Sequence, residues 1–364
     1  MTRKTIITLP GDGIGPEVTE AAVSVLKTAC LAENVQIKTI ERHFGGIGFE
    51  HDGEPVTRET LDLCKKHKIV LMGAVGGPRW DNLKPEQRPE SALLKLRKEL
   101  NVYANLRPIR VHDALASAST LKEHIITGTD ILIVRELTGG IYFGSPRGTT
   151  IENGEPQSVD TMAYSRSEIE RIATKAFQAA GIRDKRVCSV DKANVLESSR
   201  LWRSTVEEVS KSFPDVELTH MLVDNCAMQL IRNPGQFDVI VTSNLFGDIL
   251  SDEAAMLTGS IGMLPSASLG DGNGLYEPVH GSAPDIAGQG IANPFAAVAS
   301  AALLCRYSLG MEEAARRIEQ SIQAVLTSGL RSADLYTGEE GTRLADTETL
   351  REALLNHLSQ PAGV

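Results

Sequence analysis

Asp248 and Asp252 are the residues whose types and spacing most directly suggest chemistry. They stand four positions apart in a segment predicted to be helical from Ser243 or Asn244 through Met256, so both carboxylates project from one helix face. Like charges placed this way repel unless a cation lies between them, and an all-oxygen site suits Mg²⁺ or Mn²⁺. Two solvated acids near a helix N-terminus are the alternative, and the pair alone favours that alternative.

Three further charged residues stand at the ends of predicted strands. Arg135, Lys192 and Asp224 close apolar runs, and another such run precedes the aspartate pair. Ligands of open α/β sheets bind beyond the carboxyl ends of strands, so these side chains could converge near the pair. Lys192 could act as a general base if its pKa is lowered; plain surface charge is the alternative. The predicted strands span 131–134, 186–192, 216–223 and 237–242.

Three arginines at element ends, Arg97, Arg107 and Arg135, are candidates for a carboxylate clamp, because the guanidinium fork matches a carboxylate bidentately. A single arginine of this kind would by default form a surface salt bridge. Three of them together favour an anionic substrate.

The predicted helix 90–99 carries an unusual face. Glu90, Leu93, Leu94 and Arg97 fall at i, i+3, i+4 and i+7 and share one side. Such a face suits a ligand with an apolar branch and an acid group. It equally fits an ordinary amphipathic helix whose arginine extends its head group into solvent.

The remaining candidate residues lie in a glycine-rich region around Tyr142 and in two later segments rich in small residues. Tyr142 precedes a polar stretch to Val159, predicted to be a protruding hairpin or arm; this tyrosine could donate a proton, although packing is the commoner role. The segments 262–269 and 277–294 are predicted to be long loops, which are usually functional. Backbone amides at Gly281 and Ser282 could contact phosphate oxygens, and Asp285 could accept hydrogen bonds from a ribose diol.

The remaining pattern is that of an α/β protein. Pro16 stands where a dinucleotide fingerprint needs its third glycine, and the motifs of serine hydrolases, zincins and P-loop enzymes are missing from the sequence. The other predicted strands span 5–9, 37–40 and 69–72, and the other predicted helices begin at Pro16 or span 57–66, 167–180, 198–213, 225–232, 293–308, 311–327 and 347–358.

Composition narrows the class further. The chain has 364 residues, 41% hydrophobic and 23% charged, and a net charge of -10, which is globular composition and disfavours nucleic acid or an anionic membrane as a partner. The five cysteines form no Cys-x-x-Cys pair. Together with the absence of a basic and apolar leader or a membrane-length run, they predict a cytoplasmic protein with reduced thiols.

Taken together, these motifs resemble the β-decarboxylating dehydrogenases, the isocitrate/isopropylmalate dehydrogenase family, over nearly the whole chain. The segments that carry the resemblance are Gly11 to Glu17, Leu96-Arg97, Asn105 to Pro108, Val134 to Gly140, Asp191 to Val195, Asn244 to Asp252, and His280 to Asn293. The resemblance implies an α/β fold, not Rossmann, with two domains around one continuous mixed sheet. The first domain would be 1–103 with 258–364, and the second 104–257, with an arm at about 141–163 that joins a homodimer.

The resemblance also implies the reaction, in which a 2-hydroxy acid is oxidised by NAD and then loses its β-carboxylate. Arg97, Arg107 and Arg135 would hold the substrate carboxylates. Asp248 and Asp252, with Asp224 of the neighbouring subunit, would hold Mg²⁺ or Mn²⁺, which lowers the hydroxyl pKa and stabilises the enolate. Lys192 of the neighbour would take the hydroxyl proton and Tyr142 would help protonate the enol carbon. The implied cofactor contacts are Gly77, Glu90, Asn194, His280, Gly281, Ser282, Ala283, Asp285, Ile286 and Asn293.

The residues at two positions of the family motifs narrow the expected substrate and cofactor. Family members acting on isocitrate carry Ser and Asn on the specificity helix, whereas this chain has Leu93 and Leu94, which with Val195 could bury an isopropyl branch at about 0.8 kcal/mol per CH₂. The expected activity is therefore NAD-dependent oxidative decarboxylation of 3-isopropylmalate to 4-methyl-2-oxopentanoate in leucine biosynthesis. At Asp285-Ile286, NADP-dependent relatives carry Lys-Tyr; a carboxylate repels a 2′-phosphate and accepts from a free 2′-hydroxyl.

Some alternatives stay open from the sequence. A sister enzyme acting on D-malate, tartrate or homoisocitrate is the nearest. A Mg²⁺-dependent phosphotransferase would need a lysine-bearing phosphate loop, which the sequence lacks, and a non-catalytic dimeric binding protein is the last alternative. The chain also departs from its relatives at Leu222, where a tyrosine is common.

Overall fold

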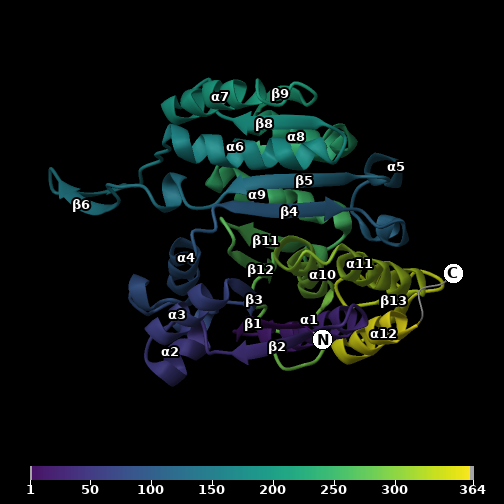
Figure 1. The fold of residues 1–364 in the computed structure, drawn as a ribbon. Coiled ribbons are helices and arrows are strands. Elements are labelled where there is room, and N and C mark those ends of the chain that lie inside the picture. Colours follow the sequence, from purple (N-terminus) through teal and green to yellow (C-terminus); the bar gives the residue numbers. More distant parts are fainter. Residues whose placement is uncertain (1, 361–364) are drawn as a thin grey trace. The chain divides into compact units, whose positions relative to one another are not determined.

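The computed structural model describes residues 2–360, and the chain divides into two compact units. Unit 1 comprises Met1–Val102, His112–Glu123 and Thr258–Val364, and unit 2 comprises Tyr103–Val111 and His124–Leu257. The fold is α/β: each unit contains five strands in mixed parallel and antiparallel order, and two short strand pairs lie apart from them (Figure 1). Within residues 2–360, no helix combines the length and the apolar character needed to cross a membrane.

The strands of unit 1 follow the order β2-β1-β3-β12-β11, parallel except for the antiparallel pair β11 and β12. These strands are β1 (Thr2–Gly11), β2 (Val35–Glu41), β3 (Ile69–Ala74), β11 (Pro265–Leu269) and β12 (Gly274–Pro278). The helices of this unit are α1 (Gly15–Ala32), α2 (Gly46–Asp52), α3 (Arg58–His67), α4 (Pro89–Glu99), α10 (Phe295–Leu304), α11 (Glu312–Thr327) and α12 (Thr347–Ser359). A short pair, β13 (Leu330–Arg331) and β14 (Arg343–Leu344), lies between α11 and α12.

Helix α1 shows why the sequence forms these elements. Pro16 occupies the first turn, where its missing N–H costs nothing, and the apolar positions recur at helical spacing. Val18, Ala22 and Val25 are fully buried, and the helix packs against α10 and α12. Helix α10 has nine buried residues out of ten, so it forms the centre of this helical layer.

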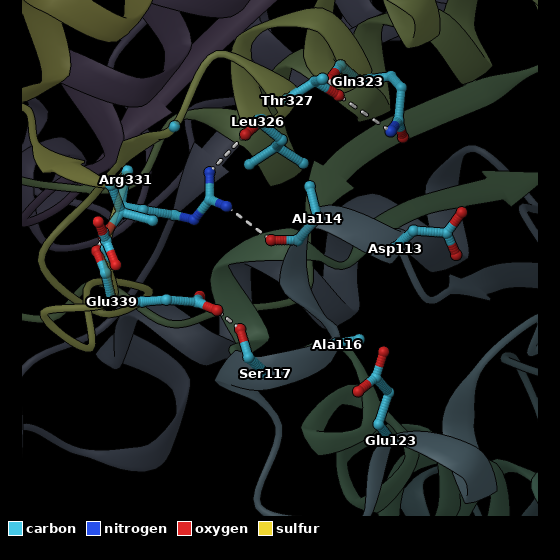
Figure 2. Close-up of a pocket in the computed structure, with 14 residues that line it drawn as sticks. Asp113, Ala114, Ala116, Ser117, Glu123, Gln323, Leu326, Thr327, Arg331 and Glu339 are labelled. Atoms are coloured by element: carbon cyan, nitrogen blue, oxygen red, sulfur yellow. Dashed lines mark hydrogen bonds between the residues drawn. The ribbon is translucent and has the colours of Figure 1, made fainter.

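The segment 112–123, which the predicted boundaries placed in the second domain, belongs to unit 1. Its 3-10 helix η3 (Asp113–Ala118) is held by Arg331, whose Nη2 donates to Ala114 O at 2.6 Å while Nη1 donates to Leu326 O at the end of α11. Ser117 donates to Glu339 at 2.6 Å. Figure 2 shows these contacts around a pocket of about 580 Å³.

The strands of unit 2 follow the order β4-β5-β10-β8-β9, with β4 antiparallel to β5 and the others parallel. They are β4 (Ala104–Arg110), β5 (Asp130–Glu136), β8 (Arg186–Asp191), β9 (Glu217–Leu222) and β10 (Val239–Thr242). The helices α6 (Arg166–Gly181), α7 (Glu197–Ser210), α8 (Val223–Arg232) and α9 (Asn244–Ala255) flank them (Figure 1). The short helix α5 (Glu123–Ile126) precedes β5.

A two-stranded hairpin, β6 (Gly148–Glu152) and β7 (Glu155–Val159), projects from unit 2 as a separate sheet (Figure 1). All ten of its strand residues are exposed, including Ile151 at 77%. A two-stranded hairpin has little stability of its own in water.

Two local predictions were wrong. Asp224 lies in the first turn of α8 rather than at the end of a strand, because β9 stops at Leu222. The segment 265–269 is a strand, not a loop; its small polar residues hid it, since Ser266 and Ser268 are buried among strand and helix neighbours instead of alternating with apolar residues.

Candidate active site

The parallel strands of unit 2 end at one edge, and this edge gathers five of the predicted site residues: Arg107, Arg135, Tyr142, Asp248 and Asp252. Arg135 near the end of β5 is in register with Thr242 at the end of β10. Because β4 runs antiparallel, its beginning reaches the same edge, with Asn105 opposite Arg135. Arg107 follows two positions later, on the same face of β4 as Asn105. The strand-end arrangement of an open α/β sheet thus collects these side chains.

Helix α9 begins directly after β10 and carries Asp248 and Asp252 to that edge. Arg135 Nη1 donates to Asp248 Oδ1, and Arg107 Nη2 lies 3.3 Å from the same oxygen. Arg107 Nη1 donates to Asp252 Oδ1 at 3.0 Å. Two arginines and two aspartates predicted from separate parts of the sequence therefore form one cluster.

Tyr142, in the 3-10 helix η4 (Gly140–Tyr142), completes this cluster. Its hydroxyl donates to Asp248 Oδ2 at 2.7 Å, and the Arg135 guanidinium lies 5.7 Å from the centre of its ring. Burial, with the Asp248 carboxylate as a second cause, raises the pKa of Tyr142 above 10. The phenol therefore keeps its proton at neutral pH and can donate it.

The donor set of α9 fits a hard divalent cation. The Asp248 side chain is 31% exposed and the Asp252 side chain 54% exposed, so carboxylate oxygens are accessible from solvent. Burial raises the pKa of Asp252, and Asp248 raises it further, while Arg107 lowers it. Between residues 2 and 360, no group of three acidic, histidine or cysteine side chains could hold a metal. The chain alone supplies two carboxylates, and Mg²⁺ completes its octahedron from water, substrate or another chain.

Lys192 and Asp224 form a second pair in unit 2. Lys192 Nζ lies 2.5 Å from Asp224 Oδ1, and this contact lowers the pKa of Asp224. The Lys192 backbone is fixed because its N–H donates to Ser199 Oγ at 3.1 Å. Asp224 does not join Asp248 and Asp252 into a three-ligand group within the described chain.

Arg97 and the two leucines of the specificity helix lie in unit 1, on α4. Arg97 Nη2 pairs with Glu277 of β12 at 2.9 Å, both side chains being at most 10% exposed, and its Nε is buried without a hydrogen-bond partner. Leu93 packs partly against the core cluster around Leu96, and Leu94 is half-buried. Glu277 was missed by the sequence reading, although a buried arginine needs a partner.

The predicted cofactor loop of unit 1 rests on the glycine-rich turn after β1. Ile14 N donates to Ser282 O at 2.8 Å, and a Cβ on Gly13 would lie 1.9 Å from that oxygen, so only glycine fits. His280 Nδ1 lies 2.9 Å from Gly281 O, whereas His280 Nε2 is buried without a partner. Burial lowers the pKa of His280.

The other predicted cofactor contacts divide between accessible and structural positions. Accessible ones include Glu90, Asn194 and Asp285, which are exposed, and Ile286 and Ala283, which are half-buried. Val195, a predicted substrate contact next to Asn194, is also exposed. Gly77 adopts φ 152 just before η1 (Pro78–Trp80). Asn293 is buried, and its side chain accepts from Phe295 N at 2.9 Å and donates to Asp334 at 3.0 Å. The Asn293 side chain thus supports the start of α10.

Asn244 and Asn105 are functional neighbours that the sequence reading missed. Asn244, considered only as a helix cap, accepts from Arg135 Nε and Nη2 at 3.0 and 2.7 Å. Asn105 accepts from Arg107 Nε at 2.9 Å. Helix α9 instead takes Ser243 as its N-cap, without a side-chain cap bond. The sequence offered one signal, the position of Asn105 two residues before Arg107 in the same strand. The burial of both asparagines is visible only in the structure.

Comparison with known proteins gives a family and close relatives. Residues 5–354 match the isocitrate/isopropylmalate dehydrogenase family. The chain is 56% identical to a 3-isopropylmalate dehydrogenase of Halalkalibacterium halodurans, covering 97% of both chains. It is 57% identical to one of Saccharophagus degradans, covering 96% of this chain and 98% of that one, and 52% identical to one of Aquifex aeolicus, covering 99% and 98%.

Solved structures agree in fold. An isocitrate dehydrogenase from Methylococcus capsulatus has a TM-score of 0.86 at 34% identity, with 98% of this chain and 100% of that one covered. A β-decarboxylating dehydrogenase from Thermococcus kodakarensis, in its apo form, has a TM-score of 0.78 at 38% identity, with 98% and 96% covered. These matches confirm the predicted resemblance and fold class.

Proposed function

The chain belongs to the isocitrate/isopropylmalate dehydrogenase family, and from this premise we propose that it oxidises 3-isopropylmalate with NAD and removes CO₂ to form 4-methyl-2-oxopentanoate, a step of leucine biosynthesis. The observation that carries the proposal is the cluster of Arg107, Arg135, Asp248 and Asp252 at the strand-end edge of unit 2. In this cluster two arginines that can bind substrate carboxylates lie next to two aspartates that can bind a metal ion.

The chemistry requires three transfers, for which this chain has candidate groups. Hydride would pass from C2 of the substrate to the nicotinamide, while Lys192 of the neighbouring subunit, in its neutral form, would take the C2 hydroxyl proton at Nζ. The C–C bond to the β-carboxylate then breaks and releases CO₂, and the resulting enol carbon takes a proton for which Tyr142 is the donor. The position of Tyr142 supports this role, because its hydroxyl lies 2.7 Å from Asp248 Oδ2 at the candidate metal site and a phenol is protonated at neutral pH.

Asp248 and Asp252 would hold Mg²⁺ or Mn²⁺, together with Asp224 of the neighbouring subunit. When bound, the ion polarises the C2 hydroxyl and stabilises negative charge on the oxygen after CO₂ loss. In the described chain both carboxylates contact arginines instead. Transfer of the carboxylates to a cation would leave Arg107 and Arg135 to bind the carboxylates of the substrate, with Arg97 from unit 1 as the third arginine.

We further propose a homodimer in which Lys192 and Asp224 serve the partner's site. Helices α8 and α9 pack together and expose Met228 at 61% and Ile249 at 57%, and Met256, directly after α9, is exposed at 47%. Large exposed apolar side chains gathered on neighbouring helices mark protein interfaces. The exposed hairpin arm gives a second surface for the same partner.

NAD is the proposed cofactor, bound by the loop from His280 to Asn293 in unit 1. The buried, unpartnered Nε2 of His280 provides a polar group for a ligand, and the exposed Asp285 supplies acceptors for a free ribose hydroxyl. Its negative charge disfavours the 2′-phosphate of NADP. The buried free cysteines support the cytoplasm as the location, because reduced thiols persist there.

The substrate assignment rests on Leu93 and Leu94 of unit 1 and Val195 of unit 2, apolar side chains that would contact the isopropyl branch. D-malate, tartrate and homoisocitrate are the alternatives to be tested beside it. The test is NADH formation by the purified protein with Mg²⁺, NAD and each acid in turn. A higher kcat/KM for 3-isopropylmalate than for the others supports the proposal; a higher value for another acid would contradict the pocket assignment.

A further inference from the structure

The two site arginines of unit 2 have their inner edges held by neutral oxygens. Arg135 donates from Nε and Nη2 to the amide oxygen of Asn244, at 3.0 and 2.7 Å. Arg107 donates from Nε to the amide oxygen of Asn105, at 2.9 Å. Both asparagines are 0% exposed, so solvent does not share these acceptors.

Other arginines of the same unit are held differently. Arg203 donates from the same Nε and Nη2 edge to both oxygens of the Asp191 carboxylate, at 2.9 Å each. Arg183 donates from Nε to Asp238 at 2.8 Å, and Arg171 Nη2 pairs with Glu136 at 3.3 Å. A carboxylate thus holds the inner edge of Arg203 and of Arg183, whereas an amide oxygen holds the inner edge of both site arginines.

The presence of an amide instead of a carboxylate beside an arginine has an electrostatic consequence. An amide oxygen and a carboxylate oxygen accept the same hydrogen bonds, but only the carboxylate carries a charge that cancels the guanidinium's field. An arginine oriented by an amide is fixed in place without a charged partner on its inner side. Its charge can then serve an anion on its outer side, where Asp248 lies in the described chain. At a partly desolvated site this difference is larger than in water.

Asn244 is built into the site as an orienting group. Its Nδ2 donates to the carbonyls of Leu137 and Gly139, at 3.1 Å each, so the amide cannot flip without losing these bonds. Its backbone N–H donates to the buried Tyr164 hydroxyl at 2.8 Å. The side chain therefore joins Arg135 to the turn that leads into η4 and Tyr142.

We propose that Asn244 and Asn105 are positioning residues that orient Arg135 and Arg107 without neutralising them, so that both charges serve to bind a dicarboxylate substrate. This inference rests on the proposed function, in which these arginines bind the two carboxylates of 3-isopropylmalate. The two asparagines act through the arginines and do not touch the reacting atoms.

The test compares Asn244→Asp, Asn105→Asp and Asn244→Ala with the control Asn356→Asp, which adds the same charge on the exposed face of α12. KM for 3-isopropylmalate and for NAD, kcat and the thermal unfolding midpoint are measured for each. We expect Asn244→Asp to raise KM for 3-isopropylmalate at least tenfold, and Asn105→Asp to raise it less, because Asn105 contacts one nitrogen. KM for NAD stays within twofold of the wild type, and Asn244→Ala raises the substrate KM less than Asn244→Asp.

Folded Asp variants whose substrate KM stays within twofold of the wild type would overturn the inference. An equal rise in Asn244→Ala and Asn244→Asp would also overturn it, because it would show a purely structural role. If Asn244→Asp does not fold, the KM of Asn105→Asp for 3-isopropylmalate decides whether the inference holds. A wild-type protein that forms no NADH from 3-isopropylmalate would contradict the proposed function itself, a result distinct from active variants with unchanged KM.

Discussion

Lys192 Nζ lies 2.5 Å from the carboxylate of Asp224, yet Asp224 does not complete a three-ligand group with Asp248 and Asp252 within residues 2–360. The proposed chemistry needs the Lys192–Asp224 pair and the Asp248–Asp252 pair at one substrate. A dimer in which each chain contributes Lys192 and Asp224 to the site of its partner brings the two pairs together.

Subunit mixing tests this sharing. Lys192→Ala and Asp248→Ala homodimers are each expected to be inactive, but exchanged subunits should recover roughly a quarter of wild-type activity, because half of the dimers are mixed and each mixed dimer has one intact site. The measurement is NADH formation after subunit exchange. The matched control mixes Lys192→Ala with Asp224→Ala, whose lesions fall on the same side of every site and should give no recovery. Equal behaviour of the two mixtures would contradict the shared site.

Gly247 controls the approach of α9 to Arg135. A Cβ at this position would lie 2.7 Å from Arg135 Cγ, so Gly247→Ala must displace the arginine. We expect roughly a tenfold to hundredfold loss in kcat/KM for 3-isopropylmalate, as for other small displacements of site groups. Gly235→Ala, where a Cβ would meet nothing within 4 Å, is the control. Unchanged kinetics in Gly247→Ala would show that Arg135 does not need its observed position.

Leu94 is the better of the two leucines for testing substrate selection. Leu93 also packs against the core, so its substitution would change stability as well. Leu94→Ala should lower the ratio of kcat/KM for 3-isopropylmalate to that for D-malate by about tenfold or more, since apolar contacts with the branch are lost. The control Leu96→Ala removes a fully buried side chain and should lower the unfolding midpoint without changing this ratio. An unchanged ratio in Leu94→Ala would remove Leu94 from the pocket.

Cofactor choice depends on Asp285. Asp285→Lys replaces a repulsive carboxylate with a cation that pairs with a 2′-phosphate, so KM for NADP should fall and KM for NAD should rise, each by roughly tenfold. Glu352→Lys on the exposed face of α12 makes the same charge change elsewhere. Steady-state kinetics with both cofactors gives the answer. A similar drop in KM for NADP in both variants would mean that net charge, rather than Asp285, governs the preference.

His280 should contribute to the pH dependence of stability. Burial lowers its pKa below 6.5 in the folded state, so the unfolded chain binds the proton more readily and stability falls as pH decreases below about 6.5. His280→Gln should unfold with a weaker dependence on pH between about 6.5 and the lowered pKa. Urea unfolding at several pH values measures this, with the exposed His124→Gln as the control. An unchanged slope in His280→Gln would mean that folding does not lower the pKa of this imidazole.

The sequence was sufficient for the elements that carry periodic or strongly polar signals. Helix α1 was predicted from its apolar spacing and Pro16. The aspartate pair of α9 was predicted from the four-residue interval. The structure places it against Arg107 and Arg135 because β5 and β10 end, and the antiparallel β4 begins, at one edge. The family matches confirm the fold that the resemblance implied.

What the sequence could not supply were contacts between distant segments. Glu277 pairs with Arg97 across 180 positions of sequence, and Asn244 meets Arg135 across 109; neither interval follows a local period. The strand at 265–269 was missed for a different reason, because its buried serines bond to neighbours and so remove the alternation that marks a strand.

The most direct test of the proposed function is NADH formation from 3-isopropylmalate, NAD and Mg²⁺, with EDTA added midway. The account predicts turnover faster than with D-malate or isocitrate, faster with NAD than with NADP, and abolished by the chelator until Mg²⁺ is restored. NADH formation that persists in EDTA would contradict the role of Asp248 and Asp252. No NADH from 3-isopropylmalate would contradict the assigned activity.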